Sequence, residues 1–110
     1  MAYSKSLDRR IMACIAHWDN VAPREMFGGV CYLLNGHMVC GVYKDFLILR
    51  LGVEEAALAL QRPGVGAFDI TGRPMKGWVM VEERACDGKK LDAWLGKARA
   101  FVSTLPDKRR

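Results

Sequence analysis

The sequence predicts an α+β domain in which helices pack on one face of an antiparallel sheet. Two stretches, one near each end of the chain, repeat apolar residues with the spacing of an amphipathic helix. Between them lies an apolar region with the dipeptide Asn35-Gly36, the strongest short signal for a β-hairpin. Helices set apart from an antiparallel sheet in this way form a two-layer fold.

The first helix is predicted over residues 6–20. Ser4 or Ser6 can cap its N-terminus, Asp8 suits its first turn, and Pro23 prevents its continuation. The apolar stripe consists of Leu7, Ile11, Cys14, Ile15 and Trp18.

Two tight turns predict a three-stranded antiparallel meander. A two-residue turn at Asn35-Gly36 places Cys31 opposite Cys40, and a second turn at Lys44-Asp45 places Val42 opposite Leu47. The same register places two strand glycines opposite the next strand, with Gly28 facing Tyr43 and Gly29 facing Val42. We interpret this glycine pair as a packing and curvature device.

Side-chain alternation then assigns the strand residues to two faces. The face predicted to pack on helices holds Phe27, Gly29, Cys31, Leu33, Met38, Cys40, Val42, Leu47, Leu49 and Leu51. The second face holds Val30, Tyr32, Leu34, His37, Val39, Tyr43, Phe46, Ile48 and Arg50. Because the second face is still rich in aromatic and branched residues, we expect another segment or a second copy to cover it. The alternative is a monomer with an ordinary amphipathic sheet face.

The second half of the chain predicts two more helices and one or two further strands. Residues 52–62 predict a short helix that buries Val53, Ala56, Ala57 and Leu60. Residues 63–77 predict a structured glycine-rich loop with a short strand at 67–70, followed by a strand at 78–81. The last helix is predicted from the cap Asp87, with the stripe Leu91, Trp94, Leu95, Ala98, Phe101 and Val102.

Composition predicts one cytoplasmic globular domain over residues 1–110. Its 51% hydrophobic content suits a packed core, and neither a membrane span nor a signal peptide is evident. The net charge of +5 comes partly from the chain ends. The basic clusters are Lys5, Arg9 and Arg10 at one end and Lys108, Arg109 and Arg110 at the other. They make weak, non-specific nucleic-acid binding one alternative function, against solvated ends.

The sequence argues against an enzyme. It has two isolated histidines, no phosphate-binding glycine motif, and no carboxylate pair at catalytic spacing, so we expect no cofactor and no metal. Cys31 and Cys40 are interpreted as reduced core thiols, with a strained disulfide or a metal site shared with Cys14 as alternatives. Another alternative is a small-anion or metabolite site on the 63–77 loop; its candidate contacts are Arg24, Arg50, Arg73 and Lys76, unless each is solvated singly.

Two segments together carry a family resemblance. The first holds Arg24, Met26, Phe27, Gly28 and Gly29, and the second holds Gly72, Arg73, Pro74, Met75, Gly77 and Trp78. With Asn35-Gly36 and residues 47–51 and 91–94, they resemble the N-terminal domain of the TfoX/Sxy competence regulators over nearly the whole chain.

The resemblance implies a small α+β domain with an arrangement similar to secretion chaperones, and it supplies no catalytic residues. It implies a non-enzymatic regulatory or protein-interaction module in competence gene expression, whose partner is a protein such as a transcription regulator. A homodimer is a further expectation. Direct DNA binding is not expected, because the chain has no counterpart of the helical C-terminal domain of such regulators.

Overall fold

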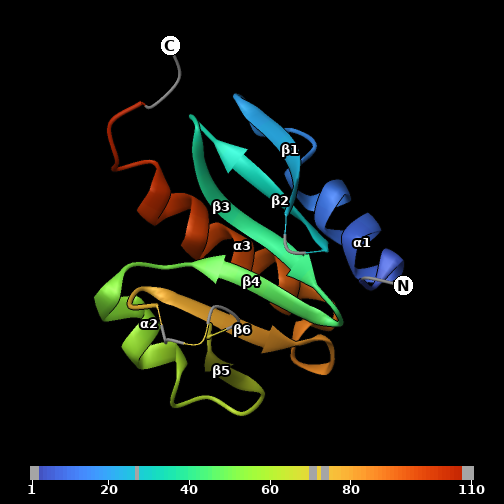
Figure 1. Cartoon of the computed structure of the whole chain (residues 1–110), viewed down its shortest axis with the longest axis vertical. Helices are drawn as coiled ribbons and strands as arrows, with labels where there is room; N and C mark the ends of the chain where they lie inside the picture. Colours follow the sequence, from blue (N-terminus) through green and yellow to red (C-terminus); the bar gives the residue numbers. More distant parts are fainter. Residues whose placement is uncertain (1–2, 27, 70–71, 73–74, 108–110) are drawn as a thin grey trace.

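The computed structural model describes residues 3–26, 28–69, 72 and 75–107. The strands are β1 (Val21–Met26), β2 (Gly29–Leu34), β3 (His37–Tyr43), β4 (Phe46–Arg50), β5 (Val65–Ala67) and β6 (Trp78–Glu82). The helices are α1 (Lys5–Ile15), α2 (Val53–Ala59), the short 3-10 helix η1 (Glu83–Cys86) and α3 (Lys89–Val102). All the strands form one antiparallel sheet in the order β1-β2-β3-β4-β6-β5, and α3 runs behind it (Figure 1). The predicted α+β class is confirmed.

Helix α1 begins at the predicted cap but ends before residue 20. The Ser4 hydroxyl accepts a hydrogen bond of 3.1 Å from the backbone N–H of Leu7. Leu7 and Ile11 are fully buried against the sheet. The helix ends at Ile15, and Asn20, with φ of 65°, leads into β1. The predicted extension of this helix to residue 20 was wrong, because the chain turns after Ile15 and enters an additional strand, β1.

Strand β1 is an edge strand that we did not predict. It contains Pro23, which has no N–H to donate, and an edge strand tolerates this loss because one of its sides is unpaired. Met26 pairs with Gly29 across the turn between β1 and β2, where Gly28 has φ of 76°. The positive φ explains a glycine at this turn.

The strand register departs from the prediction at one residue of β3. Leu34 pairs with His37 and Leu33 with Met38, as predicted, but Tyr32 pairs with Cys40. The extra residue in β3 is therefore Val39, a β-bulge that shifts the pairing of β2 by one residue.

The bulge reverses the predicted faces of β2. Because side chains alternate along a strand, a shift of one residue exchanges the two faces. The residues of β2 that join the core beneath the helices are Val30, Tyr32 and Leu34, together with Val39 of the bulge. Our assignment of Cys31, Leu33 and Met38 to that face was therefore wrong. Beyond the bulge the prediction holds for Cys40, Val42, Leu47, Leu49 and Leu51.

The two central cysteines are not opposed. Cys31 pairs with Gly41 and Cys40 with Tyr32, so the thiols point to opposite faces of the sheet. Both are free and buried, and burial raises the pKa of each thiol. The predicted opposition, on which the disulfide alternative depended, was wrong.

The predicted partners of the glycine pair were also wrong by one register step. Val42 lies opposite Val30, and Gly28 belongs to the turn. A Cβ atom built on Gly29 would lie 2.1 Å from the carbonyl oxygen of Val42, which is far inside van der Waals contact. Gly29 thus permits close approach of the neighbouring backbone.

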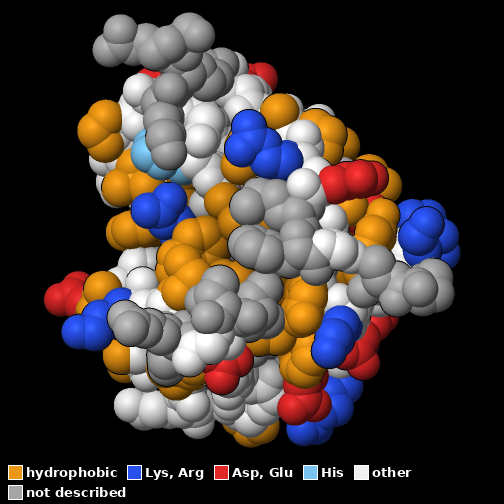
Figure 2. Space-filling view, viewed as in Figure 1, with side chains coloured by type: hydrophobic (Ala, Val, Ile, Leu, Met, Phe, Trp, Pro, Cys, Tyr) orange, Lys and Arg blue, Asp and Glu red, His pale blue; other side chains and the backbone are white. Residues whose placement is uncertain are grey.

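The second face of the sheet is covered in part by the chain itself. Phe68, which follows β5, is 2% exposed and packs with Ile48 and Met80. Figure 2 shows hydrophobic side chains gathered over the middle of this face. The structure thereby confirms coverage by another segment, while the predicted homodimer stays a prediction.

The last third of the chain follows its predicted pattern with shifted boundaries. The short strand predicted at 67–70 is instead β5, which spans Val65–Ala67. Ile70 lies outside the described residues. The N-cap of helix α3 is Gly88, so the predicted cap at Asp87 was wrong by one residue. The helix buries Leu91, Trp94, Leu95, Ala98 and Val102 as predicted, whereas Phe101 is half-buried. No helix within the described ranges has the length and apolar character to cross a bilayer.

Candidate interaction groove

Helix α2 and its C-cap residue Leu60 expose their large apolar side chains. The exposed fractions are 62% for Val53, 59% for Leu58 and 43% for Leu60. Only Ala56 and Ala59 are buried. The predicted burial of Val53, Ala57 and Leu60 was therefore wrong, because α2 packs on the sheet through two small alanine side chains.

A groove of about 270 Å³ runs between α2 and the segment that enters β6. One wall belongs to α2 and the other to the end of β5 and residues 75–78. The lining residues are Val53, Ala56, Ala57, Leu60, Ala67, Met75, Lys76, Gly77 and Trp78. Three of them, Met75, Gly77 and Trp78, belong to the segments that carry the family resemblance.

The loop wall of the groove is anchored from beneath by an aromatic pair. The ring centroids of Phe68 and Trp78 lie 5.6 Å apart. The N–H of Met75 donates a 3.0 Å hydrogen bond to the carbonyl of Phe68, which closes the loop at its base. Phe68 therefore holds both ends of the loop against the sheet.

One peptide group joins the two walls. The carbonyl of Gly77 accepts hydrogen bonds from the N–H groups of Leu51 and Gly52, at 2.8 and 3.1 Å. Gly77 has φ of 89°, and a Cβ added there would lie 3.4 Å from the backbone of Gly52. The positive φ thus favours glycine at this point of the second segment, whereas a Cβ there would make only an ordinary van der Waals contact.

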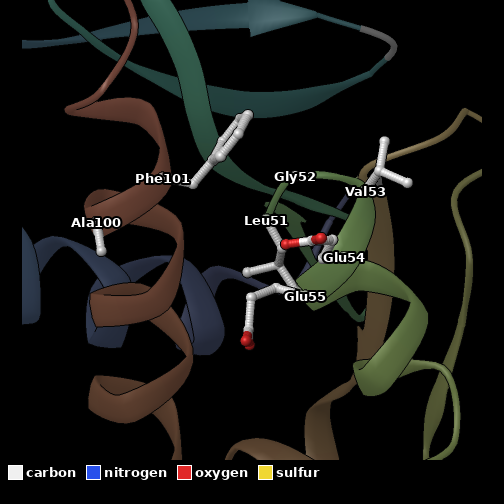
Figure 3. A pocket seen from close by; sticks show the side chains of 7 residues that line it. All are labelled: Leu51, Gly52, Val53, Glu54, Glu55, Ala100 and Phe101. Atoms are coloured by element: carbon white, nitrogen blue, oxygen red, sulfur yellow. The ribbon is translucent and has the colours of Figure 1, made fainter.

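A second hollow lies on the other side of Val53. It has a volume of about 380 Å³ between α2 and α3 and is lined by Leu51, Gly52, Val53, Glu54, Glu55, Ala100 and Phe101. In Figure 3 the side chains of Glu54 and Glu55 extend into this space, whereas Val53 points away from it. We call it the acidic hollow. Val53 lines both the acidic hollow and the groove and separates the two.

The acidic hollow is bordered by cations that already have partners. Lys97 lies 3.4 Å from the carboxylate of Glu55, with both side chains roughly half exposed. The guanidinium of Arg50 stacks on the rings of Trp78 and Phe101, at 5.4 and 6.0 Å from their centroids. Within the described residues, Glu54 has no ion-pair partner.

Two of the four candidate anion contacts, Arg24 and Arg50, lie on strands that are not neighbours in the sheet. Arg24 lies exposed on β1, and Arg50 lies on β4. Two strands separate them, which amounts to about 14 Å across the sheet. Lys76 lines the groove, and Arg73 lies outside the described residues.

The residues of the family resemblance divide between two regions of the structure. Arg24 and Met26 belong to β1, Gly28 and Gly29 follow them, and Gly72, Met75, Gly77 and Trp78 belong to the loop and the start of β6. Phe27 and Pro74, like Arg73, fall outside the described residues. The first region shapes the sheet edge, and the second builds the groove.

Of the two basic clusters, the structure describes only the one near the N-terminus. Arg10 donates a hydrogen bond to the carbonyl of Cys86, and the ammonium of Lys5 lies 5.4 Å from the ring of Tyr3. Lys108, Arg109 and Arg110 lie outside the described residues. Those same described ranges contain no group of three or more His, Cys, Asp or Glu side chains placed to hold a metal ion.

Sequence reasoning missed the exposure of α2 and one buried polar pair. Every residue from 56 to 60, in α2 and at its C-cap, is apolar, which is more than one face of a short helix can bury. That excess was the available signal for an exposed apolar surface. The pair between Asp8 and Tyr32 joins distant segments and had no local signal.

The comparisons with known proteins agree with the resemblance. The family model described as the TfoX N-terminal domain matches residues 13–102, nearly the whole chain. No curated protein and no solved structure matches the chain. The matched span includes β1, the glycine turn, the groove and α3, and the chain therefore belongs to the TfoX N-terminal domain family.

Proposed function

We propose that this domain is a regulatory module that acts by binding another protein through the groove beside α2, and not by catalysis. One observation carries the proposal. Of the five large hydrophobic side chains that are exposed in the described residues, four (Val53, Leu58, Leu60 and Met75) lie on α2 or line the groove. Concentrated apolar exposure of this kind marks an interaction site on a soluble domain.

The family gives this interaction a biological setting. TfoX-type proteins are regulators of competence gene expression, so the proposed partner is a component of that regulation, such as a transcription regulator. The proposal needs no reacting group in the groove, whose lining is aliphatic and aromatic apart from Lys76.

The fifth exposed hydrophobic residue supplies a matched control. Met12 lies on α1 with 44% of its surface exposed, close to the value for Leu60. Figure 1 shows α1 and α2 at opposite ends of the molecule. A photo-crosslinking amino acid can therefore be placed at Leu58 or at Met12 in the protein expressed in its host.

We expect a discrete crosslinked protein from position 58 and none from position 12. Leu60→Asp should remove the product, because it places a charge on the apolar wall, whereas Met12→Asp should leave it unchanged. Equal products at both positions, or a product at 58 that survives Leu60→Asp, would contradict a specific groove. A crosslinked product with the mass of two copies of this chain would show that the partner is a second copy and that the domain forms a homodimer.

A further inference from the structure

The surface beside α2 has an apolar half and an acidic half, which meet at Val53. The groove lies on one side of this residue and the acidic hollow on the other. A segment that lies across Val53 therefore meets both halves at once. In the lower left of Figure 2, where Figure 1 places α2, charged side chains lie directly beside hydrophobic ones.

The size of the apolar half favours a short segment over a globular partner or a second copy. Three exposed aliphatic side chains of its lining, Val53, Leu60 and Met75, present on the order of a few hundred Å², the size of one patch on a monomer. A stable dimer buries about 800 Å² on each partner. A single helix laid in a groove needs only a few anchor side chains.

The form of the groove wall favours a helical segment. Val53, Ala57 and Leu60 are spaced i, i+4 and i+7, so they form one stripe along α2, and all three line the groove. The small Ala57 at the middle of the stripe lets a second helix approach closely between two larger side chains. By contrast, β5 at the neighbouring sheet edge has three residues, too few for a peptide strand to pair with along its length.

The acidic hollow specifies the charge beside those anchors. The Glu54 carboxylate extends into a space bordered by Leu51 and the ring of Phe101 (Figure 3). A lysine or arginine can lay its aliphatic stem on such apolar surface and bring its charged end to a carboxylate. Glu55 is already paired with Lys97, which leaves Glu54 as the acceptor.

From this arrangement we infer that the groove binds a short amphipathic helix that carries a lysine or arginine beside its apolar anchors. This inference rests on the proposed function and adds the chemistry of the partner. The apolar side chains of the helix lie between Leu60 and Met75, and its basic side chain crosses Val53 to reach Glu54. The domain itself has a net charge of +5, so it attracts a basic segment only through such a local acidic site.

The test uses two synthetic amphipathic helical peptides, one of leucine and lysine and the other of leucine and glutamate. Binding is measured by fluorescence anisotropy and located by NMR amide shifts on the labelled full chain. We expect the leucine–lysine peptide to bind about tenfold more tightly than its acidic counterpart. Its shifts should concentrate on residues 51–60 and 75–78 and on Phe101.

Two charge reversals separate the local site from the overall charge. Glu54→Lys and Glu25→Lys change the net charge equally, but Glu25 lies on β1, at the opposite edge of the sheet from β5. We expect Glu54→Lys to weaken binding of the leucine–lysine peptide about tenfold and to strengthen binding of the acidic peptide. Glu25→Lys should leave the ratio of the two affinities within about twofold.

The results distinguish this inference from the proposed function. Equal effects of the two reversals, or shifts centred away from α2, would overturn the basic amphipathic helix as the ligand. The proposed function would still stand if crosslinking at Leu58 remained sensitive to Leu60→Asp. The inference would be supported if Leu60→Asp abolished binding of both peptides and if Glu54→Lys, but not Glu25→Lys, changed the ratio of their affinities.

Discussion

The hydroxyl of Tyr32 on β2 donates a 2.5 Å hydrogen bond to the carboxylate of Asp8 on α1, inside the core. Tyr32 is 4% exposed and Asp8 9% exposed, and Asp8 is the one charged residue that is buried among those described. The bond ties the first helix to the sheet at the place where the bulge turns Tyr32 inward. Burial and this hydrogen bond to Asp8 raise the pKa of Tyr32 well above its ordinary value.

We expect Tyr32→Phe to destabilise the protein by about 1–3 kcal/mol at neutral pH, because a buried carboxylate loses its donor. The raised pKa favours the neutral phenol in the folded state. Neutral Tyr32 therefore contributes its full share to the free energy of unfolding below about pH 10, the pKa of tyrosine in the unfolded chain. Above that pH its contribution declines by about 1.4 kcal/mol per pH unit. Urea unfolding should show a smaller difference in the free energy of unfolding between wild type and variant at pH 11 than at pH 8. A larger difference at pH 11 would contradict this account.

The crowded position of Gly29 predicts opposite effects for two glycine substitutions. Gly29→Ala should lower stability by at least ~2 kcal/mol, because the new Cβ would lie against the carbonyl oxygen of Val42. Gly96→Ala should raise it by up to ~1 kcal/mol, since Gly96 lies on an exposed part of α3 with open space around it. Thermal unfolding of both variants checks the pair, and a neutral Gly29→Ala would mean that β2 and β3 can separate at little cost.

Thiol reactivity should follow burial. Cys14 is half-buried, whereas Cys31, Cys40 and Cys86 are buried; burial raises the pKa of Cys86 to about 11. A thiol reagent at pH 7.5 should therefore modify Cys14 first in the native protein. After denaturation without a reducing agent, all four thiols should react. A titre below four would show an oxidised pair that this fold does not place together, and Cys14→Ser should abolish the fast phase.

Phe68 should be the residue on which the loop wall depends most. Phe68→Ala removes a buried ring that contacts Ile48, Met80 and Trp78, so we expect a loss of about 3 kcal/mol. The amide of Met75, which bonds to the carbonyl of Phe68, should then exchange faster with solvent. Phe46→Ala on the same face removes a ring that is only partly buried and should cost less, about 1 kcal/mol. Unchanged exchange at Met75 would show that the loop is held by other contacts.

Local signals predicted the turns and the long helix. Asn35 and Gly36 both have positive φ, as a type I′ turn requires, and the turn at Lys44-Asp45 sets the predicted register of β3 with β4. The stripe of α3 repeats over four turns, which makes its buried face unambiguous. Each of these features depends on residues close together in the chain.

Features that depend on distant partners could not be predicted in the same way. Both faces of β2 are apolar in the sequence, so nothing in the alternation showed that Val39 is an extra residue. Pro23 predicts the end of the first helix, but an edge strand also accommodates a proline. The groove was missed because its walls come from α2 and the 75–78 segment, which are distant in the sequence and are brought together by the fold.

The hydrogen bonds to the carbonyl of Gly77 also divide the domain into a frame and an insert. The chain leaves the end of β4, makes α2, β5 and the loop, and returns at Gly77 to β6, which is the neighbour of β4 in the sheet. The insert, residues 53–76, is held to the frame by these hydrogen bonds, by the pairing of β5 with β6, and by the buried side chains of Ala56, Ala59 and Phe68. Substitutions at the exposed positions of the insert, such as Val53, Leu58, Leu60 and Met75, can therefore change the surface that the domain presents, while the four meander strands, β6 and the two long helices keep their packing.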